Sequence, residues 1–166
     1  MPAHYPERIV CLTEETTETL YLLGEERRIV GISGYTVRPP QARRDKPRVS
    51  AFLSAKTDKI LTLKPDLVIG FSDLQADIAR ELAKAGLNVM LFNQRSVEEI
   101  LSTILVLSSV VGASDKGLQL VKQLEAGLAQ IRADGNHHHF AGDAHAVELL
   151  LFCRHMNLVI QIDFFQ

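Results

Sequence analysis

Two adjacent carboxylates, Glu14 and Glu15, are the first side chains in this sequence whose types and spacing suggest chemistry. Paired acids serve many hydrolases as general acid and general base. Here they follow Thr13, which is suited to cap a helix, and acids in a first helical turn commonly compensate the helix dipole while staying solvated. We therefore expect Glu14 and Glu15 to be dipole-compensating, and we assign no catalytic residue.

A histidine-rich stretch near the C-terminus could hold a divalent metal, because imidazole nitrogen is a common zinc ligand. The histidines are His137, His138, His139, His145 and His155. The run lacks the i, i+4 spacing of two ligands on one helix face. A solvated loop fits this pattern better, so we expect no metal site and no intrinsic cofactor.

Motifs of the best-marked enzyme classes do not occur in the sequence. There is no G-x-G-x-x-G, Walker A, G-x-S-x-G or H-E-x-x-H pattern, and residues 31–34 supply only a G-x-x-G fragment. Cys11 and Cys153 lie far apart and form no C-x-x-C pair, so both are predicted to be small buried hydrophobes. These absences remove the best-marked nucleotide-binding, hydrolase and zinc-protease interpretations.

Composition excludes other partners. The net charge is −2, with 18 basic and 20 acidic residues, so no basic surplus exists to neutralise phosphates, and nucleic acid is an unsuitable partner. No apolar run approaches the roughly 18 residues of a membrane span, so the chain is not expected to be membrane-embedded. The first apolar run, residues 9–12, is too short for a secretory signal, which predicts a cytoplasmic chain as written.

Short apolar runs alternate with helix-period segments up to about residue 112, which predicts an α/β fold with a mainly parallel sheet flanked by helices. The predicted strands are Arg8 to Leu12, Arg28 to Ile32, Asp66 to Phe71 and Asn88 to Phe92. Helices are expected over residues 14–23 and 57–63, after the capping-box pairs Ser72/Gln75 and Ser96/Glu99, and from Ser114. Leu118, Val121, Leu124, Leu128 and Ile131 are expected to form one seam of that last helix.

Ligands of parallel sheets bind beyond the carboxyl ends of the strands, where successive loops open towards the same side. The loops that follow the predicted strands hold hydrogen-bonding and aromatic side chains. The candidate ligand-binding residues at this position are Thr13, Glu14, Tyr35, Phe52, Phe71, Asn93 and Arg95.

Several ordered segments resemble the cobalamin and iron-siderophore group of periplasmic binding proteins, the substrate-binding components of ABC importers. The resemblance is carried by Arg8-Ile-Val-Cys-Leu-Thr13 with Thr17-Glu18, by Arg28-Ile-Val-Gly-Ile-Ser33-Gly-Tyr35, by Pro40 and Lys46-Pro47-Arg48-Val49, by Lys59-Ile60, and by Leu63-Lys64-Pro65-Asp66-Leu67-Val68-Ile69. It covers about residues 7 to 133.

The resemblance implies a binding protein and not an enzyme. It also implies two α/β lobes joined by one long helix, with a small-molecule ligand held in the cleft between them. The helix from Ser114 would be that connector. By position, Tyr35 and Phe52 would contact a corrin ring, and Phe71 would line the cleft. Asp58 would dock onto arginines of an ABC permease. The family commonly has a proline near Glu14, so this loop departs from the family pattern.

Other interpretations of these residues stay open. Tyr35 and Phe52 could be rim aromatics with only packing roles, and Phe71 could belong to the core. Asp58 fits equally well as an acid favoured by the dipole of its own helix. Asn93 and Arg95, with the intervening Gln94, could cap the sheet end instead of touching a ligand.

The sequence thus predicts an N-terminal ligand-binding lobe over residues 1–112, a connector helix over 113–133, and an atypical tail over 134–166 in place of a second lobe. The function implied is that of a monomeric importer component, either intact or truncated, for cobalamin, ferric siderophore or haem-like ligands. By resemblance it would act in the periplasm. The alternatives are a cytoplasmic small-molecule sensor or enzyme that reuses the lobe, and a non-functional fragment.

Overall fold

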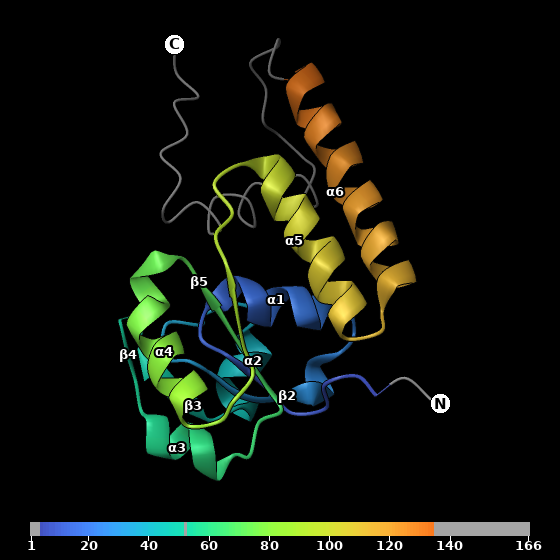
Figure 1. Cartoon of the computed structure of the whole chain (residues 1–166). Helices are drawn as coiled ribbons and strands as arrows, with labels where there is room; N and C mark the ends of the chain where they lie inside the picture. Colours follow the sequence, from blue (N-terminus) through green and yellow to red (C-terminus); the bar gives the residue numbers. More distant parts are fainter. Residues whose placement is uncertain (1–3, 52, 135–166) are drawn as a thin grey trace.

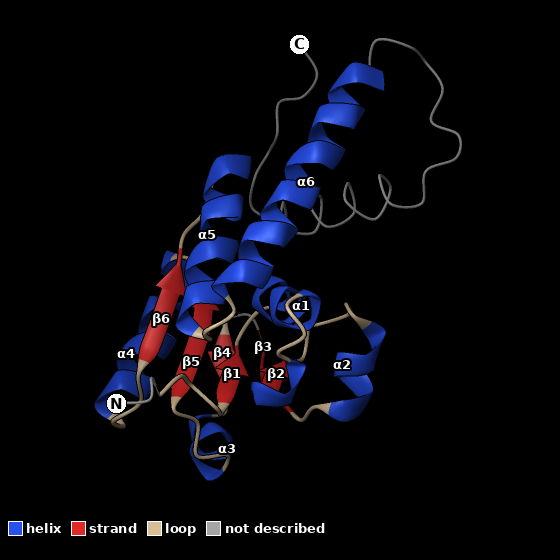
Figure 2. Ribbon diagram, turned by 90° about the vertical axis from the view of Figure 1, so that its right-hand side faces the viewer, coloured by secondary structure: helices blue, strands red, loops and turns tan. Residues whose placement is uncertain are grey.

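A computed structural model of the chain describes residues 4–51 and 53–134. Its strands form one sheet in the order β4-β3-β2-β1-β5-β6, flanked by helices (Figures 1 and 2). The strands are β1 (Ile9–Cys11), β2 (Ile29–Ser33), β3 (Arg48–Ala51), β4 (Ser54–Ala55), β5 (Leu67–Phe71) and β6 (Val89–Phe92). All neighbours pair in parallel except β3 and β4. The predicted α/β fold is confirmed.

Each of the four predicted strands is present and begins one residue later than predicted. Strands β3 and β4, which form an antiparallel pair at one edge of the sheet, were not predicted from the sequence. These two strands are short, and their flanks carry Pro47 and several charged residues, so they lack the aliphatic run that marks the inner strands.

The helices are α1 (Glu14–Leu22), α2 (Pro40–Asp45), α3 (Thr57–Thr62), α4 (Ala76–Lys84), α5 (Val97–Val110) and α6 (Ser114–Asp134), with 3₁₀ turns at Glu26–Arg28 and Asp73–Gln75. Helix α2, which begins with Pro40 at its first position, was not predicted from the sequence. Gly24 and Gly112, which follow the ends of α1 and α5, adopt positive φ angles of 69° and 74°, which favour glycine.

The two faces of the sheet bury two separate clusters, because successive side chains of a strand point to opposite faces. In β1, Ile9 and Cys11 face the side covered by α1 and α5. Val10 and the following Leu12 face the side covered by α3 and α4. Cys11 is fully buried with a free thiol, as predicted. Cys153 lies outside the described residues.

Helices α5 and α6 form an antiparallel hairpin that continues above the sheet (Figure 1). Their lower ends join the sheet through Leu107, Val111 and Ala113. Higher up, a third cluster belongs to the two helices alone, and it consists of Ile100, Ile104, Val121 and Leu124. The predicted α6 seam is correct at Val121 and Leu124 but wrong at Leu118, whose side chain is 50% exposed.

One predicted capping box is wrong. Ser72 Oγ accepts from the backbone N–H of Leu74, but Gln75 does not reach back to Ser72. Instead the Gln75 side chain turns inwards, accepts from Phe71 N at 2.9 Å and donates to Leu12 O at 3.4 Å. At the start of α5, Ser96 Oγ accepts from Glu99 N at 3.2 Å as predicted, whereas the Glu99 carboxylate accepts from Arg95 N.

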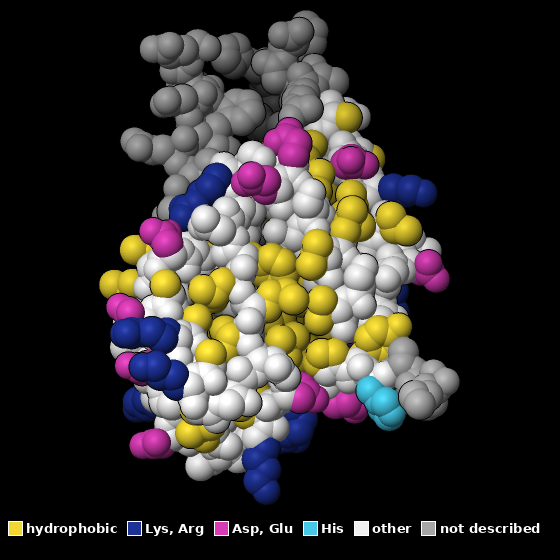
Figure 3. Space-filling view, viewed as in Figure 1, with side chains coloured by type: hydrophobic (Ala, Val, Ile, Leu, Met, Phe, Trp, Pro, Cys, Tyr) yellow, Lys and Arg dark blue, Asp and Glu magenta, His cyan; other side chains and the backbone are white. Residues whose placement is uncertain are grey.

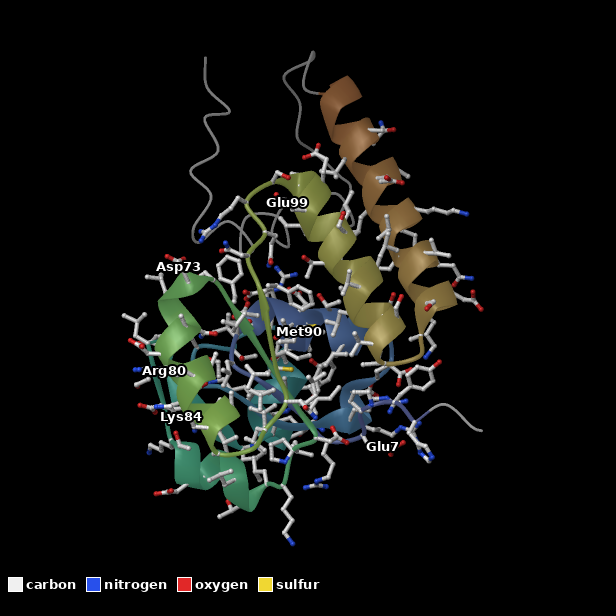
Figure 4. All side chains as sticks on the ribbon, viewed as in Figure 1. Glu7, Asp73, Arg80, Lys84, Met90 and Glu99 are labelled. Carbon is white, nitrogen blue, oxygen red and sulfur yellow. The ribbon has the colours of Figure 1, made fainter. Side chains whose placement is uncertain are left out.

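Strand β6 forms the edge of the sheet, and all four of its residues are half-buried. Figure 3 shows apolar side chains gathered on this face between α4 and the lower half of α5, and Met90 of β6 is labelled there in Figure 4. Within the described ranges, no helix is long and apolar enough to cross a membrane.

Candidate functional site

The loops that follow β1, β2, β5 and β6 lie at one edge of the sheet, because these strands are parallel. We call this edge the rim and define it as residues 12–14, 33–38, 72–73 and 93–96. Figure 2 shows that α5 and α6 rise beyond the rim, on the side to which the strand arrows point. The edge predicted to bind ligand therefore leads, through residues 93–96, into the N-terminal end of α5, whose N-cap is Ser96.

Three of the predicted ligand-binding residues meet at the β5–β6 end of the rim. The Arg95 guanidinium lies 5.4 Å from the centroid of the Phe71 ring, within the range of a cation–π interaction. Its Nη2 donates to Asn93 Oδ1 at 2.8 Å and to Asp73 Oδ1 at 3.1 Å. Phe71 is only 4% exposed, whereas Arg95 and Asn93 are exposed. An oriented cation thus stands on a buried aromatic ring at the surface.

The acids at the start of α5 and α4 frame this cation. Asp73 and Glu99 are labelled in Figure 4 at the starts of the 3₁₀ turn before α4 and of α5. Asp73 pairs with the guanidinium, and Glu99 accepts from the backbone N–H of Arg95. Both contacts reduce the freedom of the Arg95 segment, and the guanidinium keeps donors that can face a ligand.

Tyr35 stands on the loop after β2, and its side chain is 68% exposed. Glu14 lies beside this loop, and its Oε2 accepts from Val37 N at 2.8 Å. The next residue, Arg38, donates to the buried carboxylate of Glu18 on α1. Glu18, although part of a segment that carries the family resemblance, and Arg38 were not predicted as site residues, because 20 residues separate them and no local spacing pairs them.

Thr13 occupies the N-cap position of α1 with extended backbone, but its side chain makes no capping hydrogen bond. It is 3% exposed, and its Oγ1 lies 3.3 Å from Thr16 Oγ1. The neighbouring Glu15 is half-buried, and burial, with the nearby Glu14 and Glu18 carboxylates, raises its pKa to about 7. Acids at the start of α1 are thus less solvated than the sequence suggested.

Several buried side-chain oxygens at or next to the rim have no hydrogen-bond partner among the described residues. They are Glu14 Oε1, Thr36 Oγ1, Ser50 Oγ and Gln94 Oε1. Ser50 lies in β3 beside the loop after β2, since Gly34 N donates to its carbonyl at 2.7 Å. Unsatisfied buried polar groups are rare in proteins and concentrate at functional sites, which favours the rim as the site.

Two predicted residues remain to be placed. Phe52 falls outside the described residues. Asp58 is exposed in the first turn of α3, and Figure 2 places α3 beyond the tails of the strands, at the other end of the sheet from the rim. The structure therefore separates the proposed docking acid from the candidate ligand site.

The described part of the chain contains no group of three or more histidine, cysteine or acidic side chains that could hold a metal ion. The histidines at 137–139, 145 and 155 lie outside it. Burial raises the pKa of the Cys11 thiol to about 12, so Cys11 is not a thiolate nucleophile or ligand at neutral pH.

The described residues thus form an α/β lobe with hydrogen-bonding and aromatic side chains at the carboxyl ends of its parallel strands, followed by a long helix, which is the arrangement of a ligand-binding α/β protein. The sequence comparison gives the same class. The chain belongs to the periplasmic binding protein family, whose profile matches residues 9–136.

Curated relatives carry transport-related names. The chain is 30% identical over 131 residues to an uncharacterised ABC transporter substrate-binding lipoprotein, YvrC, of Bacillus subtilis, covering 76% of this chain and 41% of the relative. It is 32% identical over 129 residues to the vitamin B12-binding protein of Vibrio cholerae, covering 76% and 46%. The chain spans about half the length of the relatives it matches.

Solved structures agree with this assignment. The periplasmic vitamin B12-binding protein BtuF of Vibrio cholerae superposes with a TM-score of 0.70 at 25% identity, over 81% of this chain and 52% of that one. The periplasmic haem-binding protein RhuT of Roseiflexus gives 0.70 at 26%, over 76% and 49%. A possible iron-binding protein of Staphylococcus epidermidis gives 0.74 at 21%, over 82% and 54%, which shows the shared fold.

Proposed function

We propose that this chain supplies the ligand-binding lobe of a substrate-binding protein for an ABC importer, and that its ligand is a cobalamin, a haem or a ferric siderophore. One observation carries the proposal: the rim combines the exposed aromatic ring of Tyr35 with the Arg95 cation held over Phe71. The role is binding and transfer, without catalysis and without a resident cofactor.

The proposed ligands share a rigid, extended, partly apolar framework with anionic or polar groups at its periphery. An exposed tyrosine ring buries apolar area on such a framework at a small cost in side-chain entropy. A guanidinium pairs with carboxylates or phosphates through two parallel hydrogen bonds. Tyr35, Arg95 and Asn93 would make these contacts, Phe71 would orient Arg95, and Glu14 and Thr13 would shape the floor near β1. Phe52 is proposed as a second aromatic contact.

Helix α6 is proposed to be the connector between lobes, with residues 1–112 as the lobe, 113–133 as the connector and 134–166 as a segment unlike a second lobe. A cleft needs a facing surface, since small-molecule sites bury most of their ligand. We expect this chain to bind weakly alone and to need a second lobe for high affinity.

The proposed transport role includes a permease partner and an extracytoplasmic location, with the protein acting as a monomer. Asp58 is the proposed docking residue, because an exposed carboxylate can pair with permease arginines. Its position away from the rim would leave the ligand site unobstructed during docking.

The proposal is tested by titrating two proteins with ligand probes. One protein is the chain itself, and the other is a chimera that joins residues 1–133 to the second lobe of the Vibrio cholerae vitamin B12-binding protein. The probes are cyanocobalamin, hemin and a ferric hydroxamate siderophore, and binding is measured by calorimetry and absorbance. We expect one probe to bind the chimera, and Tyr35→Ala and Arg95→Ala each to weaken binding by about tenfold or more.

Arg80→Ala is the matched control for Arg95→Ala. Arg80 is an exposed arginine on α4 that pairs with Asp77 and lies outside the rim. Its replacement should leave affinity unchanged. Absence of binding for all three probes would refute the transport proposal. Equal losses of affinity for Arg80→Ala and Arg95→Ala would show that the rim is not the binding site.

A further inference from the structure

The loop that carries Tyr35, residues 33–38, is held to the sheet by its own backbone. Gly34 N donates to Ser50 O at 2.7 Å, and Thr36 N donates to Ser33 O at 3.2 Å. Tyr35 N donates to Ser33 Oγ at 3.2 Å, and Thr36 is fully buried. The first half of the loop is therefore a tight turn fixed against β2 and β3.

The second half of the loop is held by two carboxylates one helical turn apart on α1. Glu14 Oε2 accepts from Val37 N at 2.8 Å. Glu18 Oε1 accepts from Arg38 Nε at 2.9 Å, and it lies 2.8 Å from Arg38 Nη2 in the same ion pair. The Glu18 side chain is only 9% exposed and that of Arg38 24% exposed, so water screens this ion pair weakly.

Tyr35 itself is not held by packing, since 68% of its side chain is exposed. Its place on the rim therefore depends on the loop backbone, which is tied down on both sides of it. We infer that Glu14 and Glu18 are positioning residues that hold the Tyr35 loop against α1 and so present the Tyr35 ring to ligand. This inference rests on the proposed function for its ligand, but not for the ordering of the loop.

The physical gain is preorganisation. A loop that orders only on binding loses conformational freedom at that moment, and the loss weakens affinity. A loop already ordered by Glu14 and Glu18 avoids this cost. Neither carboxylate needs to touch the ligand, so the two acids affect binding through Tyr35.

The sequence contains no tryptophan, so Tyr35→Trp places a single indole on the loop as a fluorescent reporter. In the full chain with this change, we expect Glu18→Gln combined with Arg38→Gln to lower the anisotropy of the reporter indole. Its acrylamide quenching constant should rise by about twofold, as expected for a freed loop. Restoring Glu18 with Arg38→Lys should recover part of the anisotropy, because lysine keeps the charge but not the forked donors.

Glu14 provides a second test that does not disturb the buried ion pair. Glu14→Gln keeps an oxygen that accepts from Val37 N, whereas Glu14→Ala removes it. We expect Glu14→Ala to mobilise the reporter indole and Glu14→Gln to leave it ordered. If the Glu18/Arg38 variant unfolds, as circular dichroism would reveal, this pair of Glu14 variants decides the question.

The matched control removes an ion pair elsewhere: Arg80→Gln breaks the exposed pair with Asp77 on α4 and should leave the mobility of the reporter indole unchanged. Unchanged indole mobility in both the Glu18/Arg38 and Glu14→Ala variants would overturn the inference.

Titration with cyanocobalamin and hemin, with Tyr35 in place, adds the affinity readout. We expect about a tenfold loss of affinity in the Glu18/Arg38 variant. If neither these two probes nor the ferric siderophore binds the chain or the chimera, the proposed function fails, while the mobility of the reporter indole still decides the inference.

Discussion

The ammonium of Lys116 lies 2.8 Å from Glu25 Oε1, across 91 residues of sequence. Lys116 is in the first turn of α6, and Glu25 is in the loop after α1. The other oxygen of Glu25 accepts from Arg28 Nε at 2.8 Å. One carboxylate therefore ties the start of α6, the proposed connector, to the lobe.

Glu25→Gln should weaken this attachment and lower the free energy of unfolding by about 1 to 2 kcal/mol, because Glu25 is 16% exposed and contacts two cations. Burial alone would raise the pKa of Glu25, but Lys116 and Arg28 outweigh it and lower the pKa below 4.5. The stabilisation is thus complete above about pH 4.5 and is lost as the pH falls through the lower folded pKa. Urea unfolding of the original chain and of the Glu25→Gln variant, at a series of pH values across this range, measures this loss of stability. Equal acid sensitivity of the two proteins would contradict the assignment.

The Glu15 carboxyl group should give the unfolding free energy the opposite dependence on pH. Its folded pKa of about 7 lies above the ordinary 4.5, so the folded state binds this proton more tightly than the unfolded chain does. The unfolding free energy should therefore fall as the pH rises from about 4.5 to about 7, by up to about 3 kcal/mol. Glu15→Gln removes the titrating group and should flatten this part of the curve. Denaturant midpoints at a series of pH values test it, with Glu81→Gln on the exposed face of α4 as a control that keeps the slope.

The inner sheet was predictable because residues buried on both faces form aliphatic runs, as in residues 67–69 of β5. The rim followed from the rule that parallel strands end at one edge, and that rule correctly brought Phe71, Asn93 and Arg95 together. Both features depend on local pattern and on topology, which a sequence records directly.

Contacts between distant segments were not predictable. Glu18 and Arg38 are both ordinary charged residues, and only the fold places the carboxylate where the guanidinium reaches it. Gln75 has the spacing of a capping-box residue. Its amide oxygen instead accepts from the buried N–H of Phe71, because a buried donor without an acceptor would lower the stability of the fold. The hydrogen bonds of Gln75 to Phe71 N and to the distant Leu12 O thus take the place of the predicted capping contact.

Gln75→Leu should test how much this inward amide contributes. Leucine is similar in size but leaves Phe71 N without its side-chain acceptor and removes the donor to Leu12 O. We expect a loss of about 1 to 3 kcal/mol in unfolding free energy. Gln75→Glu keeps an acceptor for Phe71 N and should also destabilise, through burial of a charge at neutral pH, but recover at low pH. A neutral effect of Gln75→Leu would show that the amide is dispensable.

The close approach of α5 and α6 depends on Gly117, which is buried against α5 where a Cβ atom would overlap the Ser108 side chain. Gly117→Ala should therefore destabilise the hairpin by about 1 to 3 kcal/mol through overpacking, even though alanine is the better helix former. Ser108→Gly alone should cost about 0.5 kcal/mol of helix propensity. In the double variant the overlap is removed, so the two changes should be less destabilising together than their sum. Thermal unfolding of all four proteins forms a double-mutant cycle. Simple additivity would mean that Gly117 and Ser108 are not in contact, and that the packing between α5 and α6 differs from that described.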